Sequence, residues 1–462
     1  MHDTLIYNPE DTICAISTPH GSGGVAIIRV SGRKALDIVA KLWKGRNLNT
    51  VDSHTVHLGK INDYEGNTLD EVLLTLFKNP SSFTGEDVIE LGVHGSRWIQ
   101  SRLIQSLIDA GCRLALPGEF TQRAFRTGKI DLAQAEGIAD LIASSSKAAH
   151  RLAMSQMRGT YSNKIETMRQ ELLQLASLLE LELDFSEEDV EFASRSQLLK
   201  ISDKLAIQLQ NASDSFRQGH ALKDGIPIAI IGRTNAGKSS LLNTLLGDDK
   251  AIVSDIHGTT RDIVEDTIEL GDYKIRLQDT AGLRKTKDPI EQIGIERTKT
   301  AAKSAGLVLF VVDISSKGKP ETQRKEIDIY NPKTTIILLN KCDVAIQFNI
   351  KEWEKAYPDY TILPCSAATE EGIARLKETI TEKITSEIDE TDIIVANARH
   401  AHAFDLSAQY LRQFTEALRN NIPSDLAAQD LREAIHHLSS ITGSITTPEI
   451  LNNIFSHFCV GK

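Results

Sequence analysis

The chain has 462 residues, of which 41% are hydrophobic and 25% charged, and this ordinary globular balance excludes a mostly disordered protein. A chain of this length exceeds what one compact core supports, so we expect about two to four domains. The formal net charge of −11 excludes an overall field that attracts nucleic acid, so any RNA contact must come from local basic patches.

The cysteines and the start of the chain bear on where the protein works. The five cysteines are widely scattered, without the close spacing of a zinc site, so we expect reduced thiols. Residues 1–12 are polar and acidic, unlike a signal peptide. The most apolar segment, Gly306–Val312, is far too short to cross a bilayer. We expect a cytoplasmic protein, or a soluble organellar one, that has no membrane contact.

The N-terminal part predicts a small α+β domain. Val25–Val30 and Val72–Phe77 are short apolar runs separated by Gly-rich turns, which favours strands. Trp98–Ala110 is amphipathic and favours a helix. Strands mixed with helices in this way are typical of an α+β domain.

The sequence then becomes helical in two places. Turn residues are sparse, and apolar residues recur at helical spacing through Leu172, Leu175 and Leu179. A second helical stretch covers about Ser196–Gln218. The same texture returns over residues 393–458.

The segment between these helical parts alternates strands with helices, which is typical of a doubly wound α/β domain. The predicted strands are Ile226–Ile231, Ile275–Gln278, Gly306–Asp313, Thr334–Leu339 and Thr361–Leu363. We interpret this as an α/β domain inserted into an all-helical domain whose two parts pack together; two unrelated helical segments are the alternative. The expected domains are residues 1–125 (α+β), 126–224 (helical, first part), 225–385 (doubly wound α/β) and 386–462 (helical, second part).

The sequence Gly232–Ser239 has the pattern of a P-loop, which binds nucleotide phosphates. A predicted strand precedes it, and a helix over Ser240–Leu246 follows. Its glycines let backbone N–H groups turn toward phosphate, and the helix N-terminus adds partial positive charge. We expect Lys238 to contact the β- and γ-phosphates and the Ser239 hydroxyl to bind Mg²⁺.

Four further signatures follow, as in guanine-nucleotide-binding proteins. Asp279–Gly282 follows a strand and predicts a Mg²⁺ contact through its aspartate. Asn340–Asp343 follows another strand, and its last aspartate can accept two hydrogen bonds from guanine. Ser366–Ala367 follows a third strand and is expected to contact the guanine oxygen. Gly258–Asp262 lies between the P-loop and Asp279–Gly282, with Thr260 as the expected second Mg²⁺ ligand. Together the five signatures predict a GTP site.

One familiar catalytic residue is missing. Many GTPases place a glutamine directly after the Asp-x-x-Gly signature to orient the attacking water. Leu283 stands there, and its side chain cannot hold a water molecule. Arg284, Asp288 and Glu291 are the polar candidates nearby. From the residues alone, each of them fits an ordinary solvated switch residue better than a catalytic one.

Several motifs outside the P-loop are more specific than the P-loop itself. They are Thr18–Gly24, Phe83–Asp87, Leu116–Phe120, Gly128–Leu132, Gln134–Glu136 and the C-terminal Phe458–Lys462. Asn235, Gly258–Asp262 and Leu283 agree with them. Together these motifs resemble the MnmE (TrmE) family of tRNA modification GTPases, among the TrmE-Era-EngA-like P-loop GTPases, and the resemblance covers essentially the whole chain.

Two positions depart from the family pattern. Thr234 stands where a proline is common, and Glu370 stands where the guanine loop usually has a glycine. The loss of the glycine is expected to stiffen this loop. Because the base-contacting Ser366 and Ala367 remain, GTP binding is still expected.

The resemblance implies potassium-stimulated GTP hydrolysis and a homodimer whose nucleotide domains pair across the nucleotide face. Asn235, Ser254, Ile256 and Thr259 match the family's K⁺ site. A cation held against the phosphates can stabilise developing negative charge, where other GTPases insert an arginine. A glutamate of the family orients the attacking water. The expected catalytic residues are Glu291, Lys238 and Thr260.

The resemblance also implies that 5-formyltetrahydrofolate, or a related tetrahydrofolate, binds between the N-terminal domains of a dimer. Arg29, Glu90 and Lys129 match this site, and the tail of the chain brings Lys462 toward it. Taken alone, an isolated Arg or Lys is usually a surface residue. Arg and Lys can, however, pair with the glutamate-tail carboxylates of a folate, and Glu90 with the pterin N–H groups. We expect no nucleophilic role for Cys459, and its context fits a prenylation signal poorly.

The complete expected GTP site joins the signatures with the family's switch loop. It comprises Asn235, Ala236, Gly237, Lys238, Ser239, Ser240, Ser254, Asp255, Ile256, His257, Gly258, Thr259, Thr260, Asp279, Thr280, Ala281, Gly282, Asn340, Lys341, Asp343, Ser366 and Ala367.

The activity that the resemblance implies is modification of carbon 5 of the tRNA wobble uridine. A folate one-carbon donor and a flavin-dependent MnmG-type partner in a hetero-oligomer would give a carboxymethylaminomethyl- or aminomethyl-type uridine. One alternative is a GTPase switch in ribosome assembly, which predicts a basic RNA-binding face and no folate pocket. Another is a domain that reports its nucleotide state to a membrane or protein partner. The N-terminal motifs argue against both alternatives.

Overall fold

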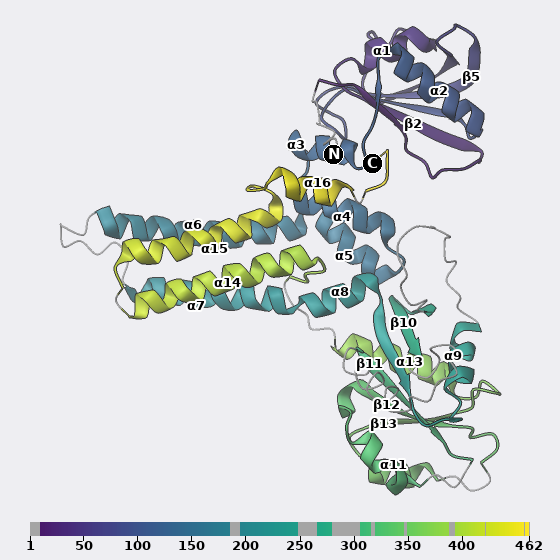
Figure 1. Cartoon of the computed structure of the whole chain (residues 1–462), viewed down its shortest axis with the longest axis vertical. Coiled ribbons are helices and arrows are strands. Elements are labelled where there is room, and N and C mark those ends of the chain that lie inside the picture. The colour runs from purple at the N-terminus through teal and green to yellow at the C-terminus, as the bar shows by residue number, and fades with distance from the viewer. Residues whose placement is uncertain are drawn as a thin grey trace, which may run out of the picture. The chain divides into compact units, whose positions relative to one another are not determined.

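The computed structural model describes most of the chain, and the described part divides into two compact units (Figure 1). The described residues are 10–184, 195–247, 266–279, 305–315, 319–345, 349–387, 393–420, 422–456 and 458–461. The first unit comprises Met1–Ala139, Gln156–Thr167 and Leu438–Lys462, and the second comprises Asp140–Ser155 and Met168–His437.

A seven-stranded sheet forms most of the first unit, in the order β3-β4-β5-β6-β2-β1-β7. The strands are β1 (Ile13–Ile16), β2 (Val25–Ser31), β3 (Trp43–Lys44), β4 (Thr55–Asn62), β5 (Thr68–Phe77), β6 (Val88–His94) and β7 (Arg113–Leu114). Helices α1 (Ala35–Leu42) and α2 (Arg97–Ala110) pack against it, and their buried apolar residues join one core with those of the strands. The predicted N-terminal strands and helix are confirmed, and so is the α+β class.

Three more helices belong to this unit in whole or in large part: α3 (Glu119–Arg126), α4 (Leu132–Ala143) and α16 (Pro448–Ser456). Helix α16 packs against α3 and α4. Leu451, Phe455 and Phe458 share a buried cluster with Leu132 and Ala135 of α4, and Phe125 of α3 packs against this cluster. The C-terminal segment is therefore part of the N-terminal unit, although more than 300 residues separate them in sequence.

Helices before and after the α/β segment pack together in the second unit. Figure 1 shows α6 (Thr160–Asp184), α7 (Arg195–Asp214), α14 (Ala398–Arg419) and α15 (Ser424–Thr442) side by side. Ser213 Oγ of α7 donates to the Ala401 carbonyl of α14 at 3.1 Å. Ser407 Oγ of α14 donates to the Ala434 carbonyl of α15 at 2.8 Å. This packing confirms the predicted insertion of an α/β domain into a helical one.

The predicted helix over Ser196–Gln218 is two helices in the structure. α7 ends at Asp214, and α8 covers Phe216–Asp224. The break has a tertiary cause, since Ser215 Oγ accepts a hydrogen bond from the Val395 amide, 180 residues away. The returning chain also passes so close to Gly219 that a Cβ there would lie 2.2 Å from the Val395 carbonyl oxygen.

The inserted domain is a six-stranded sheet in the order β13-β12-β11-β8-β10-β9. Its strands are β8 (Ile226–Ile231), β9 (Asp266–Leu270), β10 (Tyr273–Asp279), β11 (Leu307–Asp313), β12 (Thr335–Asn340) and β13 (Thr361–Cys365). Its helices are α9 (Lys238–Gly247), α11 (Pro320–Ile327), α12 (Ile350–Ala356) and α13 (Ile373–Glu387), with a short 3₁₀ turn, η1 (Pro332–Thr334). The five predicted strands are confirmed, but β9 was missed.

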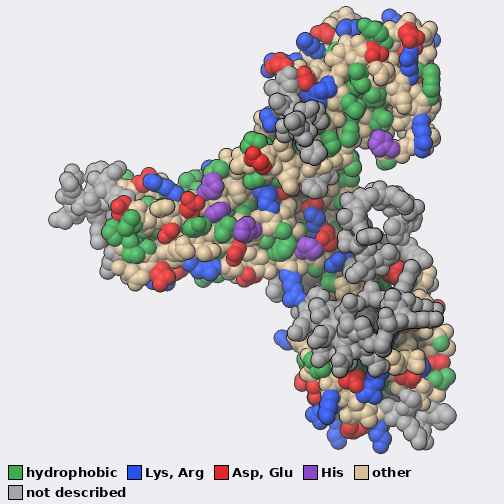
Figure 2. Space-filling view, in the orientation of Figure 1, with side chains coloured by type: hydrophobic (Ala, Val, Ile, Leu, Met, Phe, Trp, Pro, Cys, Tyr) green, Lys and Arg blue, Asp and Glu red, His purple; other side chains and the backbone are tan. Residues whose placement is uncertain are grey.

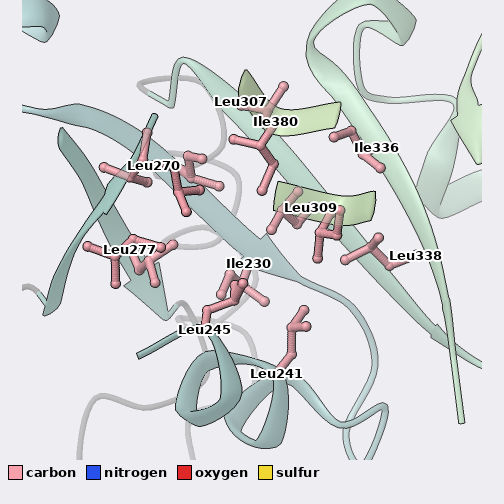
Figure 3. Close-up of a cluster of buried hydrophobic side chains, with 14 of the residues drawn as sticks. Ile230, Leu241, Leu245, Leu270, Leu277, Leu307, Leu309, Ile336, Leu338 and Ile380 are labelled. Carbon is pink, nitrogen blue, oxygen red and sulfur yellow. The ribbon is translucent and has the colours of Figure 1, made fainter. Parts of the chain in front are cut away.

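Both faces of this sheet are buried, as its sequence pattern requires. Ile228 and Ile230 of β8 point into one core, which Figure 3 shows with residues of α9 and α13, whereas Ala229 and Ile231 point into another. The sequence of a parallel strand that is covered on both faces is a nearly continuous run of apolar residues. Edge strand β9 pairs antiparallel with β10 and alternates buried with exposed positions, so its short mixed sequence gave no such signal.

Across the described ranges, no helix combines the length and the apolar character that a membrane span requires.

Candidate functional site

The P-loop joins β8 to α9, and two of its glycines are required by close backbone approaches. Gly232 has φ +143°, and a Cβ there would lie 2.2 Å from the Val311 carbonyl oxygen. Gly237 has φ +94°, and a Cβ there would lie 2.2 Å from Asn340 Nδ2. Between them, Asn235 adopts φ +63°, in the left-handed region that Asn tolerates. The loop is therefore tightly curved and packed against two neighbouring strand ends.

Lys238 folds back over this loop. Its side chain is buried, and its Nζ donates to the carbonyl oxygens of Gly232 at 2.8 Å and Arg233 at 2.7 Å. These contacts hold an ammonium group at the mouth of the loop, beside the N-terminus of α9. Ser239 and Ser240 lie exposed in the first turn of that helix. This concentration of positive charge and backbone N–H groups suits a polyphosphate.

The aspartate of the Asp-x-x-Gly signature lies at the end of the neighbouring strand. Asp279 is the last residue of β10 and pairs in register with Ile230 of β8, one residue before the strand ends. Other predicted site residues lie outside the described residues. They are Ser254, Asp255, Ile256, His257, Gly258, Thr259, Thr260, Thr280, Ala281, Gly282, Glu291 and Lys462.

Asn340 connects three of the predicted signatures. Its side chain is buried, Nδ2 donates to the Ala236 carbonyl at 2.8 Å, and Oδ1 accepts from the Ala367 amide at 3.1 Å. The P-loop and the Ser366–Ala367 loop are thus fixed to the end of β12. Asp343 lies exposed three residues further on, where its carboxylate can accept hydrogen bonds from a base. The structure therefore brings the predicted phosphate and guanine loops together.

The guanine loop keeps its sharp turn despite the missing glycine. Glu370 adopts φ +64°, a left-handed conformation that costs a residue with a Cβ about 1 kcal/mol. Two residues later Gly372 has φ +77°, and a Cβ there would lie 2.4 Å from the Pro364 carbonyl oxygen. The Ser366 amide donates to the Glu371 carbonyl at 2.9 Å, which closes the loop.

Sequence reasoning missed two polar residues at this edge of the sheet, Asp313 and Ser315. The Asp313 carboxylate accepts hydrogen bonds from Lys341 Nζ and from the amide and hydroxyl of Ser315. The sequence did contain a signal for Asp313, because a charged residue stands at the end of an apolar strand there. In a doubly wound sheet, ligands bind at the carboxyl ends of the strands, so such a residue lies close to the site.

A second predicted site lies on the N-terminal sheet. Arg29 of β2 and Glu90 of β6 pair directly across the strands, and Arg29 Nη2 lies 2.8 Å from Glu90 Oε1. The Arg29 guanidinium also lies over the rings of Phe83 and Phe120, 5.7 and 5.5 Å from their centroids. Lys129 lies exposed in the turn after α3. Arg29 and Glu90 are therefore brought together, on strands 61 residues apart in sequence.

The C-terminal tail lies against the same unit. Val460 forms a β-bridge with Pro117, and the Gly461 carbonyl accepts a hydrogen bond from Ser17 Oγ at 3.1 Å. Gly461 has φ +96°, and a Cβ there would lie 2.2 Å from the Ile16 carbonyl oxygen. Only glycine fits this close approach. The tail motif is therefore held beside the start of the Thr18–Gly24 motif.

Two other N-terminal motifs are linked by a buried arginine that sequence reasoning also missed. Arg123 of α3 is fully buried and donates to Glu86 at 2.9 Å and to Glu119 at 3.0 Å. Arg113 donates to Glu119 as well, at 2.7 Å. Burial raises the pKa of Glu119, but hydrogen bonds from Arg113, Leu116 and Arg123 outweigh it and hold the pKa below its ordinary value. Glu86 and Glu119 therefore stabilise the fold.

The doubly wound sheet, the P-loop at the end of β8 and the guanine loops at the ends of β12 and β13 define the class of P-loop GTPases. Comparison with known proteins identifies the particular family. The MnmE helical domain matches residues 132–459, and the N-terminus of the GTP-binding protein TrmE matches residues 12–129. The chain belongs to the MnmE family of tRNA modification GTPases.

Full-length relatives agree with this assignment. The tRNA modification GTPase MnmE of Parabacteroides distasonis is 46% identical over 98% of this chain and 100% of its own length. The MnmE of Cytophaga hutchinsonii is 44% identical over 100% of both chains. Among solved structures, Era of Aquifex aeolicus is 27% identical over 40% of this chain and 66% of its own, with a TM-score of 0.28. Because the family consists of tRNA modification GTPases, the protein is an enzyme that hydrolyses GTP.

Proposed function

We propose that this GTPase acts in the modification of carbon 5 of the tRNA wobble uridine. In this reaction a tetrahydrofolate, such as 5-formyltetrahydrofolate, donates one carbon, and a flavin-dependent MnmG-type protein is the partner. The product is a carboxymethylaminomethyl- or aminomethyl-type uridine. The observation that carries the proposal is the similarity to tRNA modification GTPases from end to end, through the N-terminal and helical parts as well as the nucleotide domain.

GTP binds at the carboxyl edge of the six-stranded sheet. Lys238 contacts the β- and γ-phosphates, and Asp343 accepts hydrogen bonds from the guanine base. Ser239, Thr260 and Asp279 supply hydroxyl and carboxylate oxygens, which suit Mg²⁺. Bound there, Mg²⁺ neutralises charge on the phosphates. Ser239 in the first turn of α9 and Asp279 at the end of β10 support this donor set.

Hydrolysis depends on K⁺ and on Glu291. The oxygens of Asn235, Ser254, Ile256 and Thr259 suit a monovalent cation, and the exposed, left-handed Asn235 supports such a site on the loop's outer side. K⁺ held there supplies the positive charge that other GTPases obtain from an arginine. Glu291 orients the attacking water in place of the missing glutamine. The nucleotide domains of a homodimer pair across this face.

The N-terminal sheet binds the folate. The Arg29–Glu90 pair supports this site. When the ligand binds, Arg29 can pair with a carboxylate of the folate, and Glu90 can accept hydrogen bonds from the N–H groups of the pterin. Phe83, over which Arg29 lies, is an exposed aromatic residue and offers a face for a pterin ring, whereas Phe120 is buried beneath Arg29. Lys129 and Lys462 add positive charge for the glutamate tail of the folate.

The alternative of a ribosome-assembly switch predicts a basic face for RNA. On the face that Figure 2 shows, basic and acidic side chains of the described residues are interspersed. The similarity of residues 12–129 to the N-terminus of TrmE favours the tRNA-modification proposal over this alternative. We propose that the protein works in the cytoplasm.

The test is GTP hydrolysis by the full-length protein in K⁺ and Na⁺ buffers of equal ionic strength. We expect K⁺ to accelerate hydrolysis about tenfold or more, and Asn235→Ala to abolish the difference. A Lys333→Ala variant, which removes an exposed residue of the η1 turn, is the control and should keep the difference. Equal rates in both salts would refute the K⁺ site and shift the weight to the ribosome-assembly alternative.

A further inference from the structure

The side chain of Lys341 is held by the neighbouring strand. β11 and β12 are adjacent parallel strands, and their last residues, Asp313 and Asn340, pair in register. Lys341 follows Asn340 directly, and its Nζ lies 2.5 Å from Asp313 Oδ2. The stem of the lysine therefore runs along the carboxyl edge of the sheet, between the ends of two strands, instead of extending into solvent.

Asp313 is itself fixed in place. Its other oxygen, Oδ1, accepts hydrogen bonds from the Ser315 amide at 2.9 Å and the Ser315 hydroxyl at 2.6 Å. Burial raises the pKa of Asp313, but the hydrogen bonds from Lys341 and Ser315 outweigh it and keep the pKa below its ordinary value. The carboxylate is thus charged at neutral pH, and Ser315 leaves Oδ2 to the lysine.

The backbone of Lys341 is in an unfavourable conformation, so the contacts around it are needed to keep the residue in place. It has φ +68°, in the left-handed region, which is unfavourable for a residue with a Cβ. The next amide, of Cys342, donates to the Cys365 carbonyl at 3.2 Å. The turn is thus fixed on one side by β13 and on the other by the contact with Asp313, and Asp343 follows it directly.

We propose that Asp313, supported by Ser315, is a positioning residue that holds the Lys341 stem as a fixed wall of the guanine site beside Asp343. This inference rests on the guanine site proposed above. A long lysine side chain loses rotamer freedom when a ligand packs against it, and this loss weakens binding. Because Asp313 has ordered the side chain in advance, the base binds a preformed wall. The ligand is the purine base of GTP or GDP.

The test uses the full-length protein and a fluorescent GDP analogue with Mg²⁺. Asp313→Asn keeps the shape of the side chain and removes its charge, and we expect the nucleotide to dissociate about two- to fivefold faster. Lys341→Met keeps the apolar stem without the ammonium group. In the Lys341→Met background, Asp313→Asn should have no further effect. Glu378→Gln, which breaks the exposed Arg375–Glu378 pair of 3.0 Å on α13, is the matched control.

Two results would overturn the proposal. One is an unchanged dissociation rate in Asp313→Asn. The other is an equal acceleration with and without the Lys341 ammonium group, which would mean that Asp313 acts on the fold and not through Lys341. Ser315→Ala should reproduce a smaller part of the Asp313→Asn effect, since it loosens the carboxylate without removing it.

Failure of the guanine site itself gives a different result. Asp343→Asn should lose affinity for GTP and gain affinity for XTP, because its side-chain amide N–H can donate to the extra carbonyl of xanthine. If Asp343→Asn keeps its affinity for GTP and gains none for XTP, the guanine site is misplaced and this inference fails with it. Asp313→Asn should leave the ratio of GTP to XTP affinities unchanged, because Lys341 contacts the base without reading its polar edge.

Discussion

Single residues decide whether the nucleotide loop can form. Gly232 and Gly237 both have positive φ, and a side chain at either would overlap atoms of a neighbouring strand end. Glu370 shows the opposite case, since it adopts φ +64° with an exposed side chain. A left-handed turn tolerates a Cβ at modest cost, whereas a backbone contact at 2.2 Å does not. Space, more than φ, therefore makes the P-loop glycines necessary.

We predict that Gly237→Ala abolishes GTP binding. Its Cβ would lie 2.2 Å from Asn340 Nδ2, so the asparagine must leave the position that joins the P-loop to the guanine loop. Gly247→Ala, at the end of α9, is the matched control, because a Cβ there meets no atom of the described residues within 4 Å. Calorimetric titration with GDP measures both variants. Tight GDP binding by Gly237→Ala would show that Asn340 does not hold the two loops together.

At the scale of elements, buried charges join α3 to the loops around it. Arg123 is fully buried and donates hydrogen bonds to the carboxylates of Glu86 and Glu119. Removing one partner of such a network leaves a buried charge unpaired, and this lowers the free energy of unfolding by about 3–5 kcal/mol. Phe120, whose ring lies under Arg29, follows Glu119 directly in α3. The Arg29–Glu90 pair of the proposed folate site therefore lies beside a helix that buried ion pairs hold in place.

We predict that this network makes stability depend on acid pH. The pKa of Glu119 is lower in the folded chain than in the unfolded chain, so its contribution is fully present above the unfolded value of about 4.3. That contribution is lost as the pH falls through the folded pKa. Chemical unfolding at several pH values should show the wild type weakening below about pH 5.

The Glu119→Gln variant separates this residue from other carboxylates. It should be less stable than the wild type by about 3 kcal/mol at neutral pH, and the difference should shrink as the pH falls. Glu65→Gln, which removes an exposed partner of Arg102, is the control and should behave like the wild type. A constant difference between Glu119→Gln and the wild type at all pH values would contradict the assignment.

At the scale of the whole molecule, contacts join segments that lie far apart in the sequence. The tail of the chain binds the N-terminal sheet through Val460 and Gly461, and helices on either side of the nucleotide domain pack together. The N-terminal sheet thus contacts residues that lie 444 positions later in the sequence. Its proposed folate site depends on them too, since the tail motif ends beside Ser17.

We predict that removal of residues 459–462 weakens folate binding about tenfold or more and leaves GDP affinity unchanged. The deletion removes Lys462 and the β-bridge that fixes the tail, while the P-loop lies in the other unit. Fluorescence titration with 5-formyltetrahydrofolate and with a GDP analogue measures both effects. Arg29→Ala should weaken folate binding similarly. Unchanged folate affinity in the truncated protein would place the folate elsewhere.

Much of the nucleotide domain was predictable because its signals are local. Continuous apolar runs indicated the parallel strands, and the signatures at their ends indicated the loops that Asn340 joins. Strand β9 escaped because an edge strand is only half buried and its sequence is short and mixed. The break at Ser215 escaped for another reason: its cause is a contact with Val395, which no local pattern contains.

Local sequence patterns were sufficient to predict the fold class, the order of the elements, the P-loop and the guanine loops, because periodicity and short motifs are properties of neighbouring residues. Three contacts became visible only in the folded chain: Arg29 faces Glu90, Gly461 lies against β1, and Asp313 holds Lys341. Each of these contacts joins elements whose separation in sequence carries no information about their distance in space. Strand order and register decide which side chains meet, and they are fixed only when the whole sheet forms.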